Sequence, residues 1–166
     1  DVNTLELELI GLNNQIETIN SRLESDEKIA DNNKEKIKKA NEVLSSYDID
    51  KVNTLYKKYN ETKNKVAKLE QSREHLKMEV SHKLDKLKAI GQFDPNCDFC
   101  KNTPFIQNAF KIEKELEDDK IKSKNLLQEL AIHNLFIENN STVLDDYNKI
   151  EKLNSLLIQI ENERNT

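Results

Sequence analysis

Residues 91–104 read GQFDPNCDFCKNTP and separate two long heptad patterns. Gly91 is expected to end the preceding helix as a C′ residue with positive φ. Thr103 and the proline after it form an N-cap and N1 pair, which predicts the start of another helix. The chain's two cysteines, Cys97 and Cys100, lie between these helix ends. The stretch therefore predicts a turn between two helices that carries a Cys-x-x-Cys motif.

Before this turn, apolar residues recur every three or four positions, which is the pattern of a coiled-coil seam. The first run is Leu5, Leu9, Leu12, Ile16, Ile19, Leu23, Ala30, Ile37, Ala40 and Leu44. The second run is Val52, Leu55, Tyr59, Val66, Leu69, Leu76, Val80, Leu87 and Ile90. The two runs are out of phase by one residue, so we expect an interruption near residues 45–51.

A third run follows the turn. It is Phe105, Ala109, Ile112, Leu116, Asp119, Ser123, Leu126, Leu130, His133, Ile137, Asn140 and Leu144, and it slips by one residue into Ile150, Leu153, Leu157 and Ile160. The slip predicts a second interruption near residues 145–149. If the chain reverses at the cysteines, Tyr47 faces Ile150 and both interruptions lie at one level, which favours an antiparallel hairpin. Chance polar clusters in an Asn-rich chain are the alternative explanation.

Polar residues occupy some seam positions, among them Asp26, Asn33, Arg73, Lys83 and Asp119. Such residues weaken a coiled coil, and they also select its register. We therefore expect a modestly stable, bendable coil.

The predicted fold class is all-α, a long antiparallel coiled-coil hairpin with an apical Cys-x-x-Cys hook loop. Residues 1–91 would form the ascending arm, residues 92–103 the apical loop, and residues 104–166 the descending arm. The arms are unequal, so the seam between Leu5 and Leu23 is expected to have no facing segment in the hairpin. That seam would pair with another chain, fold back at the first interruption, or have lost its partner by truncation.

Composition excludes an ordinary compact enzyme domain. The 166 residues are 34% charged and include two glycines, two prolines and no tryptophan, which is too little for tight turns and a thick core. A net charge of −5 gives no overall attraction to nucleic acid or to anionic membranes. No apolar stretch approaches the roughly 18 residues that span a bilayer. The missing initial methionine leads us to expect a segment of a longer protein.

The two cysteines are candidate metal ligands. A Cys-x-x-Cys knuckle directs two thiolates at one tetrahedral Zn²⁺ ion, which leaves half of the site unfilled. His75, His82 and His133 are too far along the chain to complete it. A second copy of Cys97 and Cys100 would complete a shared Cys₄ site. A redox pair and unreactive thiols remain the alternatives, although the absence of a strand pattern disfavours a thioredoxin-like motif.

A long helix, an apical Cys-x-x-Cys and a returning helix resemble the zinc hook of the Rad-fifty and SbcC family of SMC-like ATPases. Carried over by position, Cys97 and Cys100 match the zinc ligands of that hook. Family hooks usually have proline and a small or apolar residue between the cysteines, whereas Asp98 and Phe99 stand here. The Asn-rich composition fits a phage recombination-nuclease subunit of this family.

The resemblance implies a non-catalytic module that dimerises through one shared zinc ion and tethers two complexes in DNA double-strand-break repair. It implies a parent ATPase that partners DNA and a nuclease of the Mre-eleven or SbcD type, with no membrane, in a bacterial or phage-infected cytoplasm, or in the nucleus if eukaryotic. With two glycines the chain has no phosphate-binding loop. The alternative is a structural or effector helical bundle with incidental cysteines.

Overall fold

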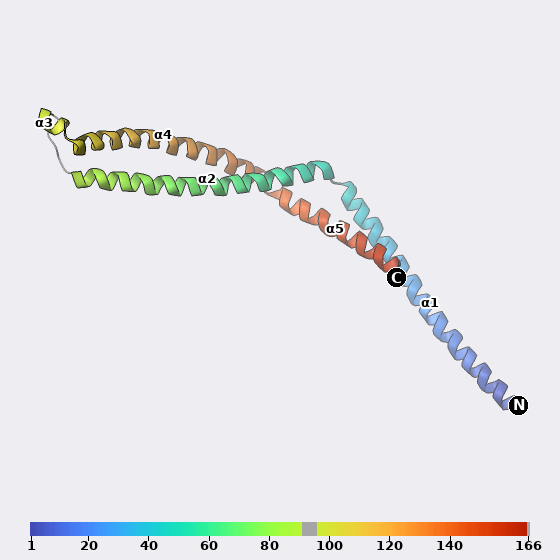
Figure 1. Ribbon diagram of the computed structural model, residues 1–166. Coiled ribbons are helices and arrows are strands. Elements are labelled where there is room, and N and C mark those ends of the chain that lie inside the picture. Colours follow the sequence, from blue (N-terminus) through green and yellow to red (C-terminus); the bar gives the residue numbers. More distant parts are fainter. Residues whose placement is uncertain (91–95, 166) are drawn as a thin grey trace. The chain divides into compact units, whose positions relative to one another are not determined.

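The protein is all-α over the part of the chain that the structure describes. The computed structural model covers residues 1–90 and 96–165, and of residues 90, 99 and 100 it describes the backbone alone. Within these limits the helices, which no strand accompanies, are α1 (Val2–Ser45), α2 (Ile49–Ile90), α3 (Asp98–Lys101), α4 (Pro104–Asn139) and α5 (Thr142–Arg164) (Figure 1). The predicted all-α class is confirmed.

The chain forms two compact units. Unit 1 combines Asp1–Val52 with Asp145–Thr166, so that α1 and most of α5 belong together. Unit 2 is Asn53–Leu144, which holds most of α2, with α3 and α4. Each unit therefore joins helical segments that are far apart in the sequence.

In unit 2, α2 and α4 lie side by side and run in opposite directions (Figure 1). Near the end of α2, Lys83 Nζ lies 2.5 Å from Asp119 Oδ2 and 3.7 Å from Glu115 Oε2. Near the start of α2, Lys58 Nζ lies 4.8 Å from the centroid of the Phe136 ring. The later residue of α2 thus meets the earlier residues of α4, which is the contact order of an antiparallel pair.

The core of unit 2 is a single narrow seam. Its buried side chains are Tyr59, Thr62 and Leu76 on α2, Ile106, Ala109, Ile112, Asp119 and Leu130 on α4, and Val143 on α5. Most of them occupy predicted heptad positions. The interior is one layer of side chains deep, because each helix has only one apolar stripe to bury.

At two positions the buried residue is the neighbour of the predicted one. Phe105 was expected in the seam, but it is 59% exposed and Ile106 is 6% exposed. Val143 is buried where Leu144 was expected. In both cases a spacing of three and a spacing of four reach adjacent residues, so the heptad pattern alone does not choose between them.

The break between α1 and α2 lies inside the predicted interruption at residues 45–51. The Ser46 hydroxyl and amide both donate to the Val43 carbonyl, at 2.5 Å and 3.1 Å. The Asp48 carboxylate then accepts a hydrogen bond from the Lys51 amide at 3.2 Å. Ser46 therefore satisfies the Val43 carbonyl at the end of one helix, while Asp48 caps the start of the next.

The predicted position of the second interruption is wrong. Residues 145–149 lie within α5, and the break falls at residues 140–141. Asn140 leaves the helical conformation with φ −119° and ψ 18°, and its side-chain amide donates to the Phe136 carbonyl at 2.8 Å. The one-residue slip of the heptad pattern occurs at this break, because buried Val143 lies one heptad before Ile150.

Within α1, only the C-terminal part contributes a buried residue to the core of unit 1. Ala40 is 3% exposed, and Ile150 and Ile160 on α5 are 1% and 3% exposed. Residues 1–32 are exposed throughout. The seam between Leu5 and Leu23 is therefore uncovered by the described residues, and α1 runs through it without a break to Ser45.

Replacing Ile150 by alanine should destabilise unit 1 by about 2–4 kcal/mol, because it removes buried methyl groups and leaves a cavity. Ile158→Ala on the same helix is the matched control, since Ile158 is 59% exposed, and it should change stability by less than about 0.5 kcal/mol. Urea unfolding followed by circular dichroism measures both. Equal effects of the two substitutions would contradict the assignment of Ile150 to the core.

Asp119 is a buried charged residue in the seam of unit 2, and its contribution to stability can be tested. Its hydrogen bond to Lys83, reinforced by the negative charges of Asp119 and Glu115, raises the pKa of the Lys83 ammonium above its usual 10.5. The stabilisation that the Lys83–Asp119 ion pair gives the folded state is therefore fully present below pH 10.5. It is lost as the pH rises through the raised pKa of Lys83.

We expect Asp119→Ala to lower the thermal unfolding midpoint at pH 7 by a few degrees, since the substitution leaves Lys83 without its main partner. Asp118→Ala, at the exposed neighbouring position, should leave the midpoint unchanged. A stability difference between wild type and Asp119→Ala that stays constant from neutral pH to well above 10.5 would contradict the ion pair.

Candidate functional site

The cysteine motif lies between the end of α2 and the start of α4. Cys97 directly precedes α3, is half-buried, and accepts a hydrogen bond at its carbonyl from the Lys101 amide at 3.1 Å. Cys100 is the third residue of α3, and its side chain lies outside the described part of the structure. The backbone of the motif therefore forms a single helical turn, which the sequence did not predict.

A helical turn suits two ligands spaced by three residues. Residues i and i+3 on a helix are neighbours, with Cβ atoms about 5–6 Å apart. Two thiolates at that separation reach one Zn²⁺ ion at the usual Zn–S distance of ~2.3 Å. The donor set of Cys97 and Cys100 therefore fits half of a tetrahedral zinc site.

The start of α4 fixes the second side of the turn. Thr103 has extended backbone angles, φ −75° and ψ 139°, and its hydroxyl accepts a hydrogen bond from the Ile106 amide at 3.4 Å. Pro104 is the first helical residue. The predicted N-cap is confirmed, whereas the predicted C′ residue, Gly91, lies outside the described residues.

The histidines lie elsewhere on the helices. His75 Nε2 on α2 lies 3.2 Å from Glu79 Oε1 on the exposed face. His82 is exposed, and His133 is half-buried on α4. Among the residues whose side chains are described, no group of three or more His, Cys, Asp or Glu side chains is arranged to hold a metal ion. Lys101 Nζ lies 3.9 Å from Asp98 Oδ1, and the side chains are 46% and 97% exposed, respectively.

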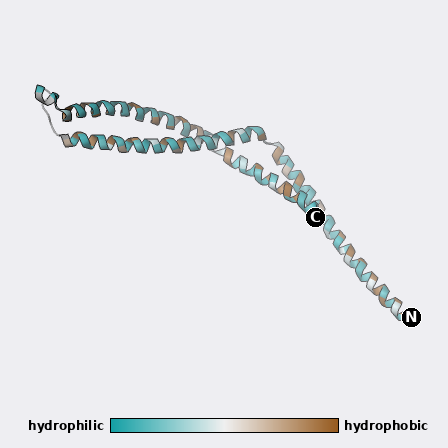
Figure 2. Ribbon diagram, viewed as in Figure 1, coloured by the Kyte–Doolittle hydropathy of each residue, from teal (hydrophilic) through white to brown (hydrophobic). Residues whose placement is uncertain are grey.

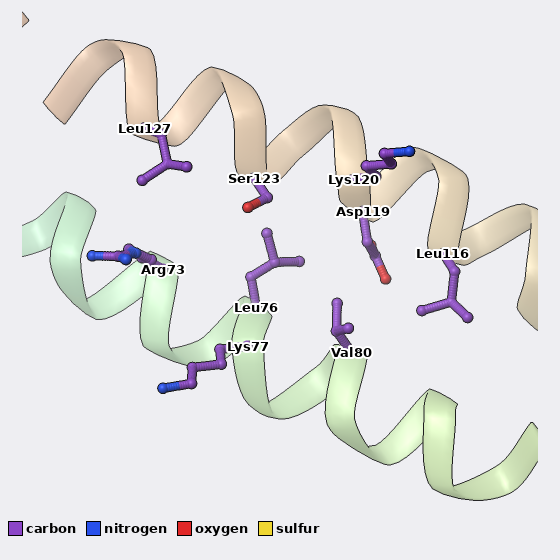
Figure 3. A pocket seen from close by; sticks show the side chains of 9 residues that line it. All are labelled: Arg73, Leu76, Lys77, Val80, Leu116, Asp119, Lys120, Ser123 and Leu127. Carbon is purple, nitrogen blue, oxygen red and sulfur yellow. The ribbon is translucent and has the colours of Figure 1, made fainter. Parts of the chain in front are cut away.

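A hollow of about 420 Å³ lies along the seam of unit 2, where residues of α2 and α4 line it. Figure 3 shows Leu76 and Val80 pointing from α2 toward α4, with Asp119 and Ser123 opposite them. The small Ser123 side chain fills less of the seam than a leucine would, so space remains. The Asp119 carboxylate is already bound to Lys83, and we assign no catalytic role to this hollow.

The Lys83–Asp119 contact is the feature of unit 2 that the sequence analysis missed. Both residues were recognised as polar seam positions, but reversal at the cysteines would place Asp119 opposite Met78 rather than Lys83. The long lysine side chain makes the contact diagonally along the seam. The pair could have been found by looking for opposite charges one helical turn away from the directly facing position.

Comparison of the chain with protein-family models, with curated proteins and with solved structures finds no match. None of the helices in the described part of the chain combines the length and apolarity that a membrane crossing requires.

Proposed function

We propose that this chain is an antiparallel coiled-coil hairpin that dimerises at its apex through one Zn²⁺ ion shared by Cys97 and Cys100 of two copies. The observation that carries the proposal is the single helical turn at Cys97, which lies directly between two long helices. The hairpin is supported by the reversed contact order of Lys58 with Phe136 and Lys83 with Asp119.

The need for a second copy follows from the number of donors. A structural zinc site takes four ligands, and one chain offers two cysteines. His82 is the histidine nearest to the motif in sequence, yet it stands on α2 fifteen residues before Cys97, so a rigid helix holds most of that distance. A two-fold axis through the metal supplies the missing pair with the same chemistry.

The biological role follows from the resemblance to the Rad-fifty and SbcC hook. In this role the module is non-catalytic and links two ATPase–nuclease complexes, so that two DNA ends or duplexes are held together. Its parent partners a nuclease of the Mre-eleven or SbcD type. The helices α2 and α4 have 42 and 36 residues, and an α-helix rises ~1.5 Å per residue. Helices of this length support the role of a spacer between the linking apex and the distant ATPase and nuclease.

The purified protein should contain about half an equivalent of zinc per chain, because each copy supplies half of a tetrahedral site. Adding zinc to metal-free protein should double the particle mass. Cys97→Ser and Cys100→Ser should abolish both effects and leave helical circular dichroism nearly unchanged, since the seams stabilise the arms.

His82→Ala is the matched control for these measurements, and it should bind zinc as the wild type does. One zinc ion per chain, or zinc retained in both cysteine variants, would refute the shared site. Protein that takes up no zinc at all would favour a structural bundle with incidental cysteines.

Acid should release the zinc-linked dimer before it unfolds the helices. A proton competes with Zn²⁺ for each thiolate, whose free thiol has a pKa of about 8.5, and four thiolates are deprotonated for one ion. Protonation of the 31 carboxylates does not by itself open an apolar seam. Sedimentation and circular dichroism, recorded over one pH series, should show two separate transitions. A single coincident transition would mean that zinc is not the link.

A further inference from the structure

The first half of α1 carries an uncovered apolar seam. Its six members, between 54% and 65% exposed, are Leu5, Leu9, Leu12, Ile16, Ile19 and Leu23. They are spaced by four and three residues, so they line one face of the helix. We call this set the N-terminal seam. Figure 2 shows hydrophobic residues recurring along this part of α1.

We propose that the N-terminal seam pairs with the same seam of a second copy, in antiparallel orientation. The two-fold axis passes between Asn13 and Gln15 in this arrangement. Each large residue then meets a large residue, because Leu5 faces Leu23 of the second copy, Leu9 faces Ile19, and Leu12 faces Ile16. Six apolar layers result, and the same surface of both copies is used, as an isologous dimer requires.

The charges beside the seam agree with this register. In an antiparallel pair, the residues that flank the seam on one side face the same side of the partner helix. Glu8 therefore faces Arg22 of the second copy, and symmetry repeats this ion pair. Asn13 faces Asn13 of the second copy, and Gln15 faces Gln15 of the second copy. No like charges face each other across the six layers.

A parallel pair in register is disfavoured by other acidic residues of the same segment. It would place Asp26 against Asp26 inside the seam and Asp1 beside Glu6 of the second copy. Like charges directly opposite each other are destabilising, more so when they are shielded from water. Asp26 instead lies just beyond the last apolar layer of the antiparallel pair.

Three heptads are about the shortest sustained repeat that indicates a coiled coil. We therefore expect weak, concentration-dependent association. It is independent of the cysteines, because the N-terminal seam and the Cys97 turn lie in different units. A chain with both surfaces has two separate self-associating faces, so failure of one leaves the other testable.

The experiment uses the full chain with Cys97→Ser and Cys100→Ser, without metal, in sedimentation equilibrium over a concentration series. We expect a reversible monomer–dimer equilibrium. Ile16→Asp should shift it to monomer, while Ile158→Asp, at an exposed position on α5, should not. If the chain with both cysteine substitutions stays monomeric over the whole concentration series, the proposal is overturned. The N-terminal seam would then bind something other than a second copy of this chain.

Charge reversal tests the register. Arg22→Glu should weaken the dimer roughly tenfold, because two attractive pairs become repulsive. Adding Glu8→Arg should restore the affinity and its salt dependence. A double variant that remains weak would overturn this register.

A cysteine placed at the axis gives a second, covalent readout in the same background. Asn13→Cys should form a cross-linked dimer on mild oxidation, because residue 13 faces residue 13 of the second copy. Asn20→Cys is the matched control and should not cross-link, since residue 20 faces Glu6. Cross-linking of residue 20 in preference to residue 13 would contradict the antiparallel pair.

Discussion

The burial of one narrow apolar stripe per helix is the constraint on which the rest of this structure depends. A chain that is 34% charged has too few apolar residues for a thick core, so each long helix is stabilised by covering its stripe with another helix. In unit 2, α2 and α4 do this for each other. In unit 1, the C-terminal part of α1 is covered and its N-terminal part is not, which is why we look to a second copy there.

Polar residues inside the seams make the pairing specific. The buried Thr62 hydroxyl donates to the Lys58 carbonyl at 2.7 Å, so it needs no partner on the facing helix. Asp119 does need one, and Lys83 supplies it. No buried side-chain polar atom in the described residues lacks a hydrogen-bond partner. A shift of register would separate Asp119 from Lys83 and bury an unpaired carboxylate, which is far more costly than misplacing a leucine.

The candidate site was predictable to the extent that it depends on local rules. Thr103 caps α4 because its hydroxyl reaches an amide three residues ahead, and this follows from the sequence alone. The position of the cysteines between two long helices was equally evident. The helical turn at Cys97 was not, because a four-residue helix has no periodicity to detect and depends on how the flanking helices end.

The sequence by itself determined that the chain is helical, where most seam residues lie and where α1 ends, because these depend on heptad spacing and on capping within a few residues. Only the tertiary structure decided that Ile106 and Val143 are buried in place of Phe105 and Leu144, that the second break lies at Asn140, and that Lys83 meets Asp119. Adjacent residues on one helix satisfy the heptad pattern almost equally well. The choice between them depends on the surface of the opposite helix, which comes from a distant part of the chain.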